Sequence, residues 1–123
     1  MKTRLTNEQS QHLIDLGVLK EKASGSVSVA PIGDGIRGLV KIPKRPIFRL
    51  EDFLNGEILP KEIKTKDGDV YLDIQIMNEN YCVNYEYIGR GTVIEYYDSP
   101  ELIEALYQLT CWYYGEYLKS EEK

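Results

Sequence analysis

Cysteine and histidine are scarce in this sequence, and their scarcity argues against a metal centre. The chain has one histidine, His12, and two cysteines, Cys82 and Cys111, with no CxxC or Cys/His grouping among its 123 residues. A zinc site needs about four closely organised ligands, so we expect no metal site and no cofactor. Both cysteines are predicted to be free thiols, as is usual in a reducing cytoplasm.

Long apolar runs and basic charge are lacking as well. No stretch approaches the roughly 18 apolar residues of a membrane span, and residues 1–10 are polar, which predicts a cytoplasmic protein without membrane contact. The formal net charge of -5 repels phosphate backbones, so direct nucleic-acid binding is disfavoured. The best basic cluster is interpreted as a solvated linker, and it comprises Lys41, Lys44, Arg45, Arg37 and Arg49.

What the sequence does contain is enough apolar content, 42%, for the core of one domain over residues 1–123. Thr6 and Gln9 have capping-box spacing, and Gly17 is placed to end a helix over residues 7–16. The first element of the domain is therefore predicted to be a short helix.

Glycine, serine, proline and valine dominate residues 23–46, which form either a loop or a hairpin. We favour a weak hairpin within residues 26–42, around Gly33-Asp34-Gly35. A helix of one to two turns is predicted within residues 47–59, before Pro60.

Alternating polar and apolar residues then predict an antiparallel meander. Asp67-Gly68 is a type I′ hairpin signal, and the clearest strand follows it, up to Met77. A turn at residues 78–80 leads to a second strand over residues 81–87, and a third covers residues 92–97. Because one face of this sheet is apolar, it needs a helix to cover it.

A helix over residues 100–118 follows, with Asp98 or Ser99 as its cap, Pro100 in its first position and a frayed tail at residues 119–123. The predicted fold class is α+β in two layers: short amino-terminal helices, a three- or four-stranded antiparallel meander, and a long carboxy-terminal helix on one sheet face. The predicted core consists of Leu72, Ile74, Val83, Tyr85, Leu102, Leu106, Leu109 and Trp112.

Three segments carry a resemblance to a family. The sequence reads PIFxLxDFL at residues 46–54, LPKEI at residues 59–63 and ELIEALY at residues 101–107, followed by Trp112 and Tyr117. This pattern resembles a group of small uncharacterised proteins of phages and other mobile elements of gut bacteria. The resemblance implies a fold and a mobile-element setting, but its motifs are packing signatures and transfer no active residue.

Two features are candidates for ligand binding. Gly33, Gly35 and Gly38 fit GxGxxG, but the following residues are predicted to be extended, so the helix that would hold a phosphate is missing. Asp73 and Glu86 lie on the polar face of the predicted hairpin, and the register at residues 78–80 decides whether Asp73 faces Glu86 or Asn84. Facing carboxylates would indicate a metal or a shared proton, whereas the alternative is a solvated polar face.

No residue set indicates catalysis. His12 is predicted to be an ordinary helical histidine, because general acid–base chemistry needs an orienting partner that the sequence does not place nearby.

Ten tyrosines are the one compositional oddity. On the long helix the apolar arc spans about 220°, more than one sheet covers. The second stripe therefore meets either the amino-terminal helices or a second copy of the chain in a homodimer. Its interface candidates are Ile103, Tyr107, Tyr114 and Tyr117.

These features favour a protein without enzymatic activity that binds a protein partner or itself, as an accessory factor of a mobile element. The alternative is a domain that binds a small ligand, a nucleotide or a metabolite, between the glycine-rich segment and the tyrosines of the sheet.

Overall fold

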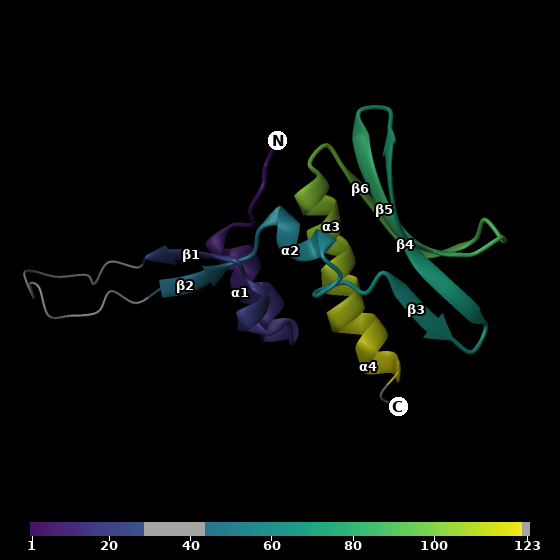
Figure 1. The fold of residues 1–123 in the computed structure, drawn as a ribbon, viewed down its shortest axis with the longest axis horizontal. Coiled ribbons are helices and arrows are strands. Elements are labelled where there is room, and N and C mark those ends of the chain that lie inside the picture. Colours follow the sequence, from purple (N-terminus) through teal and green to yellow (C-terminus); the bar gives the residue numbers. More distant parts are fainter. Residues whose placement is uncertain (29–43, 122–123) are drawn as a thin grey trace, which may run out of the picture.

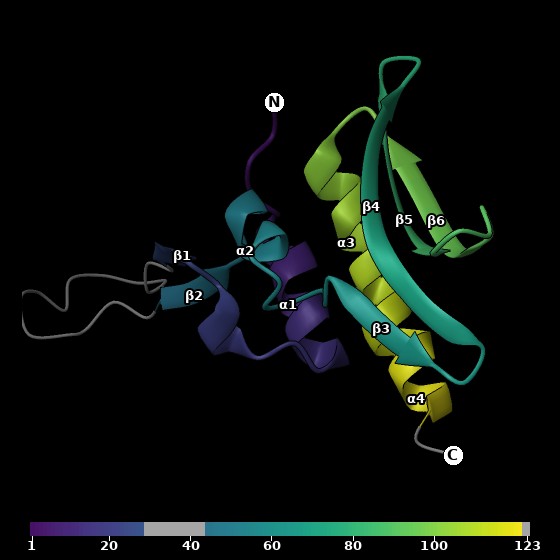
Figure 2. The same cartoon turned by 45° about the vertical axis from the view of Figure 1, so that its right-hand side comes forward.

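A computed structural model describes residues 1–28 and 44–121 and confirms the α+β fold class. Its long carboxy-terminal helix lies in the middle: a four-stranded sheet is on one side of it, and the amino-terminal elements are on the other (Figures 1 and 2). The sheet and the helix form the two predicted layers, and the amino-terminal elements add a third.

The first helix, α1 (Asn7–Leu16), is bounded by the residues that the sequence indicated. The Thr6 hydroxyl accepts a hydrogen bond from the Gln9 backbone N–H, and the Gln9 side chain accepts one from the Thr6 N–H, which completes the capping box. The helix ends at Gly17, whose φ of 120° lies in the left-handed region that favours glycine. A 3₁₀ turn, η1 (Lys20–Lys22), follows.

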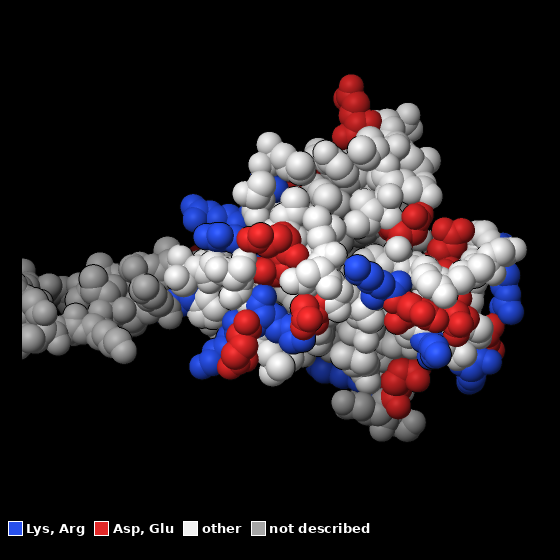
Figure 3. Space-filling view, in the orientation of Figure 1, with Lys and Arg blue, Asp and Glu red and all other residues white. Residues whose placement is uncertain are grey.

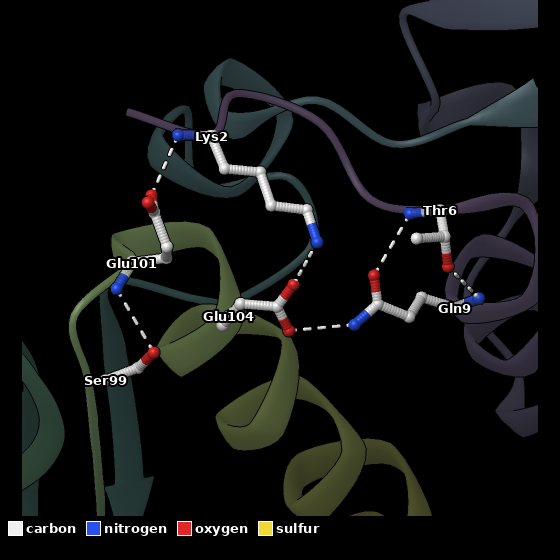
Figure 4. A network of polar contacts seen from close by, with 6 residues as sticks. All are labelled: Lys2, Thr6, Gln9, Ser99, Glu101 and Glu104. Atoms are coloured by element: carbon white, nitrogen blue, oxygen red, sulfur yellow. Dashed lines mark hydrogen bonds and ion pairs between the residues drawn. The ribbon is translucent and has the colours of Figure 1, made fainter.

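A polar network ties the amino-terminal segment to the long helix (Figure 4). The Lys2 ammonium forms an ion pair with Glu104, and the Gln9 amide donates to the other oxygen of the same carboxylate over 2.8 Å. The Lys2 backbone N–H donates to Glu101 over 2.8 Å. The two ends of the described chain are therefore joined through these side chains.

Strands β1 (Gly25–Ser28) and β2 (Lys44–Ile47) pair antiparallel, with Ser28 opposite Lys44. They flank the glycine-rich segment as the predicted hairpin requires, and its turn at residues 33–35 lies outside the described residues. The predicted short helix is α2 (Leu50–Leu54), and its buried Asp52 accepts from the backbone N–H groups of Arg49 and Ser24.

The main sheet has the order β3 (Glu62–Thr65), β4 (Gly68–Met77), β5 (Asn80–Tyr87) and β6 (Val93–Ser99), with each neighbouring pair antiparallel. This is the upper of the two predicted strand numbers. A β-bulge at Tyr85/Glu86 shifts the register between β5 and β6.

The two hairpin turns differ from each other. Thr65 lies opposite Gly68, so the loop residues are Lys66 and Asp67, and of these positions only Gly68 has a positive φ. A type I′ turn needs a positive φ at both central residues, so the predicted turn type at Asp67-Gly68 was wrong. Asn78 and Glu79 do have it, with φ of 49° and 66°, in the next turn.

The long helix comprises α3 (Leu102–Trp112), a π-helical turn, η2 (Tyr113–Tyr117), and α4 (Leu118–Glu121). The predicted caps at Asp98 and Ser99 were wrong because β6 extends through both residues and the helix begins two residues after Pro100. The predicted frayed tail is also shorter, since residues 119–121 are helical. The sequence gave no indication of the π-helical turn.

The core lies between α3 and the sheet and continues to α1 and α2. Of the predicted core, Val83, Tyr85, Leu106 and Leu109 are fully buried, Leu102 is buried, and Leu72 and Trp112 pack partly buried against them. Ile74 was placed in the core wrongly. It is 37% exposed, in the projecting part of the β4–β5 hairpin (Figure 1).

Candidate functional site

The sheet face turned away from α3, here called the outer face, is not covered by any element in the described part of the chain. Val83 and Tyr85 of β5 point to the helix and are buried, so the alternate residues of that strand lie on the outer face. Three rows cross it from β4 to β6. They are Tyr71, Glu86 and Val93; Asp73, Asn84 and Tyr96; and Gln75, Cys82 and Asp98.

Asn84, at the centre of these rows, has an unmet hydrogen-bonding requirement. Its side chain is only 8% exposed, and its Oδ1 is buried without a hydrogen-bond partner. The nearest amide donor on the face is already used, because Gln75 Nε2 donates to Asp73 Oδ2 over 2.6 Å. A buried acceptor without a partner costs about 1–3 kcal/mol, so Asn84 is an energetically unsatisfied centre.

Acidic and aromatic side chains surround Asn84. The rows include three carboxylates, those of Asp73, Glu86 and Asp98, and no lysine or arginine. Tyr71 and Tyr96 are 37% and 52% exposed. Burial and the nearby carboxylates of Glu62 and Asp69 raise the pKa of Tyr71, so its hydroxyl keeps its proton. The face therefore offers hydrogen-bond acceptors, negative charge and two aromatic rings.

The register answers the question that the sequence left open for Asp73 and Glu86. Asp73 lies opposite Asn84, and Glu86 lies opposite Tyr71. The two carboxylates are therefore diagonal neighbours, and the arrangement that would have indicated a metal or a shared proton does not form. Gly33, Gly35 and Gly38, the other ligand candidates, lie outside the described residues.

The four interface candidates on the long helix meet elements of the same chain. Ile103 is fully buried and lies in the core. Tyr107 and Tyr114 are half-buried, and the Tyr114 hydroxyl donates to the Ile58 carbonyl over 2.8 Å. Tyr117 stacks on Tyr113 with ring centroids 5.6 Å apart. Because α1 and α2 pack against this side of the helix, they account for the second apolar stripe, which is the first of the two alternatives above.

His12 has spatial partners that sequence spacing could not reveal. Its Nδ1 lies 2.7 Å from the Tyr107 hydroxyl oxygen and 3.9 Å from Cys111 Sγ, between α1 and α3. Burial raises the pKa of Tyr107 to about 12 and also raises that of the Cys111 thiol. A nucleophilic cysteine needs a lowered pKa, so this cluster is a polar contact between two helices.

A surface groove of about 440 Å³ lies at the π-helical turn. Its aromatic wall consists of Tyr87, Trp112 and Tyr117, and Lys64 and Lys66 are among the polar residues at its edge. π-Helical turns are rare and are often found at functional sites. The groove is the best place in the described chain for a small ligand.

Comparison with protein-family models, curated proteins and solved structures returned no match. No helix in the described ranges is long and apolar enough to cross a membrane. Residues 1–28 and 44–121 also bring together no group of three or more histidine, cysteine, aspartate or glutamate side chains suited to a metal ion.

Proposed function

We propose that this domain binds a partner protein through the outer face of its sheet, and that the partner presents an arginine in a basic segment. The observation that carries the proposal is the buried, unpaired Oδ1 of Asn84 at the centre of an acidic, tyrosine-bearing face. The resemblance to mobile-element proteins supports a role as an accessory factor that acts on a host protein.

Arginine fits this face better than lysine does. Its planar guanidinium stacks on tyrosine rings, carries five N–H donors and binds carboxylates in a fork-like geometry. Tyr96 lies directly opposite Asn84 and is half exposed, so a rotation of its ring opens the way to the amide oxygen. A guanidinium N–H could then satisfy Asn84 while the carboxylates of Asp73 and Glu86 balance its charge.

The proposal is tested by calorimetric titration with a tetra-arginine peptide and with a tetra-lysine peptide of equal charge. We expect the arginine peptide to bind more tightly, and Tyr96→Ala to weaken it about two- to fivefold, because an exposed cation–π contact contributes about 0.5–1 kcal/mol. Amide chemical-shift changes should centre on Asp73, Asn84 and Tyr96.

A matched pair of charge variants separates local recognition from the general attraction of an acidic protein. Asp98→Asn and Glu21→Gln each remove one exposed carboxylate, on the outer face and on η1 respectively. We expect only Asp98→Asn to weaken binding appreciably at moderate salt. Equal affinity for the two peptides, with no loss in Tyr96→Ala, would refute the proposal.

A second candidate function, binding of a small aromatic ligand, is favoured by the groove at the π-helical turn. Trp112 lines this groove and is the only tryptophan of the chain, so its fluorescence reports occupancy directly. A panel of nucleotides and aromatic metabolites should then change the emission and raise the melting temperature together. A flat response in both measurements would exclude the ligands of the panel and leave protein binding ahead.

A further inference from the structure

Part of strand β4 has an open edge beside β3. β3 pairs with β4 only as far as Tyr71, and the Leu72 N–H then donates to the Lys61 carbonyl over 3.0 Å. Beyond that bond, no backbone group in the described chain pairs with residues 73–77 on this side. Figure 1 shows this part of the β4–β5 hairpin projecting past the end of the long helix.

The alternation of the backbone identifies which groups are free. Leu72 directs its N–H toward β3, so Ile74 and Ile76, at the same phase of the strand, direct theirs to the same side. Asp73, Gln75 and Met77 direct theirs to β5, with which they are paired. The open edge therefore presents two N–H and two C=O groups.

This edge lacks the features that usually protect an edge strand. Residues 73–77 contain no proline, lysine or bulge. Ile76 is 72% exposed and Met77 is 52% exposed. Figure 3 shows that the projecting part of the molecule bears little charge on the side in view, apart from an acidic group at its top. Such an apolar strand edge is a template for another strand.

We propose that a second copy of this chain pairs with this edge, β4 against β4, antiparallel and centred on Gln75. In this register Ile74 of each copy lies opposite Ile76 of the other, and each pair exchanges two backbone hydrogen bonds, four in all. The four isoleucine side chains then form one apolar cluster across the two-fold axis. On the other face Gln75 meets Gln75, and Asp73 meets Met77, so no like charges are opposed.

The boundaries of the open edge select this register. Centring on Ile74 would place the partner's Ile76 against Leu72, where Lys61 already occupies the edge. Centring on Ile76 would place Ile74 against the turn residue Asn78, which no longer extends the strand. The register centred on Gln75 also brings Glu79 of one copy toward Lys61 of the other, which adds an attraction of opposite charges.

Because only five residues of each copy pair, the buried area falls at the low end for protein interfaces, below about 1,200 Å². We therefore expect a reversible dimer whose population rises through the micromolar range, measured by sedimentation velocity. Ile76→Lys should make the protein monomeric. Val93→Lys, at an exposed apolar site on the other edge strand β6, is the matched control and should leave the dimer unchanged. Circular dichroism verifies that both variants are folded.

A cysteine placed at the two-fold axis tests the register. Gln75 meets itself in a non-hydrogen-bonded pair, with Cα atoms about 4.5 Å apart, which a disulfide can span. Gln75→Cys should therefore give a covalent dimer on mild oxidation. The background needs Cys82→Ala and Cys111→Ala, since Cys82 lies directly opposite Gln75 in its own sheet. Asp73→Cys is the control, because its copies lie roughly 13 Å apart along the strands.

Three results would overturn the proposal: a wild-type protein that stays monomeric to sub-millimolar concentration, a dimer that survives Ile76→Lys, or equal cross-linking of the two cysteine variants. This interface uses the strand edge and the isoleucine face, whereas the arginine site centres on Asn84. Peptide binding can be measured on monomeric Ile76→Lys, so the failure of one proposal leaves the other open to its own test.

Discussion

Replacing Asn84 with valine should stabilise the fold, contrary to the usual effect of a substitution at a buried site. The change removes the unpaired Oδ1 and relieves a desolvation cost of about 1–3 kcal/mol. It also introduces a β-branched residue in the middle of a strand, which adds up to about 1 kcal/mol. Setting some lost packing against these gains, we expect the free energy of unfolding to rise by about 1–3 kcal/mol.

Thermal and urea denaturation measure this effect. Each kcal/mol corresponds to roughly 3–5 °C in melting temperature for a domain of this size. Asn84→Asp is the opposing control, because a carboxylate at this buried site has no counter-charge. Its pKa should be raised, so that variant should be least stable at high pH and recover as the pH falls. A less stable Asn84→Val protein would refute the reasoning, since it would mean that the amide is well satisfied in the fold.

Two further predictions concern the core and the amino-terminal network. Leu106 is fully buried between α3 and the sheet, so Leu106→Ala should lower the free energy of unfolding by about 2–5 kcal/mol in urea denaturation, and a loss below about 1 kcal/mol would contradict its core position. Partial burial opposes ionisation of Glu104, but hydrogen bonds from Lys2 and Gln9 outweigh it and lower the Glu104 pKa below its usual 4.5. A lowered carboxyl pKa stabilises the fold above the unfolded-state value and loses that contribution as the pH falls through the folded-state value. Wild-type stability should therefore drop more steeply below pH 4.5 than that of Glu104→Gln, and parallel profiles would argue against the network.

Local signals in the sequence were sufficient for the elements whose boundaries depend on local chemistry. The capping box at Thr6 and the left-handed Gly17 define α1 without help from the rest of the molecule. Strict alternation likewise predicted β4 and β5. Where a boundary depends on pairing with a distant strand, the local signal failed: β6 continues through Asp98 and Ser99 and delays the start of α3, against their helix-capping propensity.

The outer face could be predicted only in part, for a related reason. Asp73 and Glu86 were recognised as members of a polar face, but their separation depends on the register set by the two-residue turn at Asn78 and Glu79. The burial of Asn84 depends on side chains from three strands, so no pattern within one strand reveals it. The exposure of Ile74 is equally non-local, because the helix ends before the hairpin does.

The network in Figure 4 has a consequence for how the chain is made. Lys2 and Gln9 are synthesised first, yet the carboxylate that they bind belongs to residue 104. The helix that separates the sheet from the amino-terminal elements is the last element to leave the ribosome. Until it arrives, α1, α2 and the inner face of the sheet have no common surface on which to pack. We therefore expect the nascent chain to stay open until synthesis is nearly complete and to close in one late step, so that its exposure to chaperones and proteases falls within that interval.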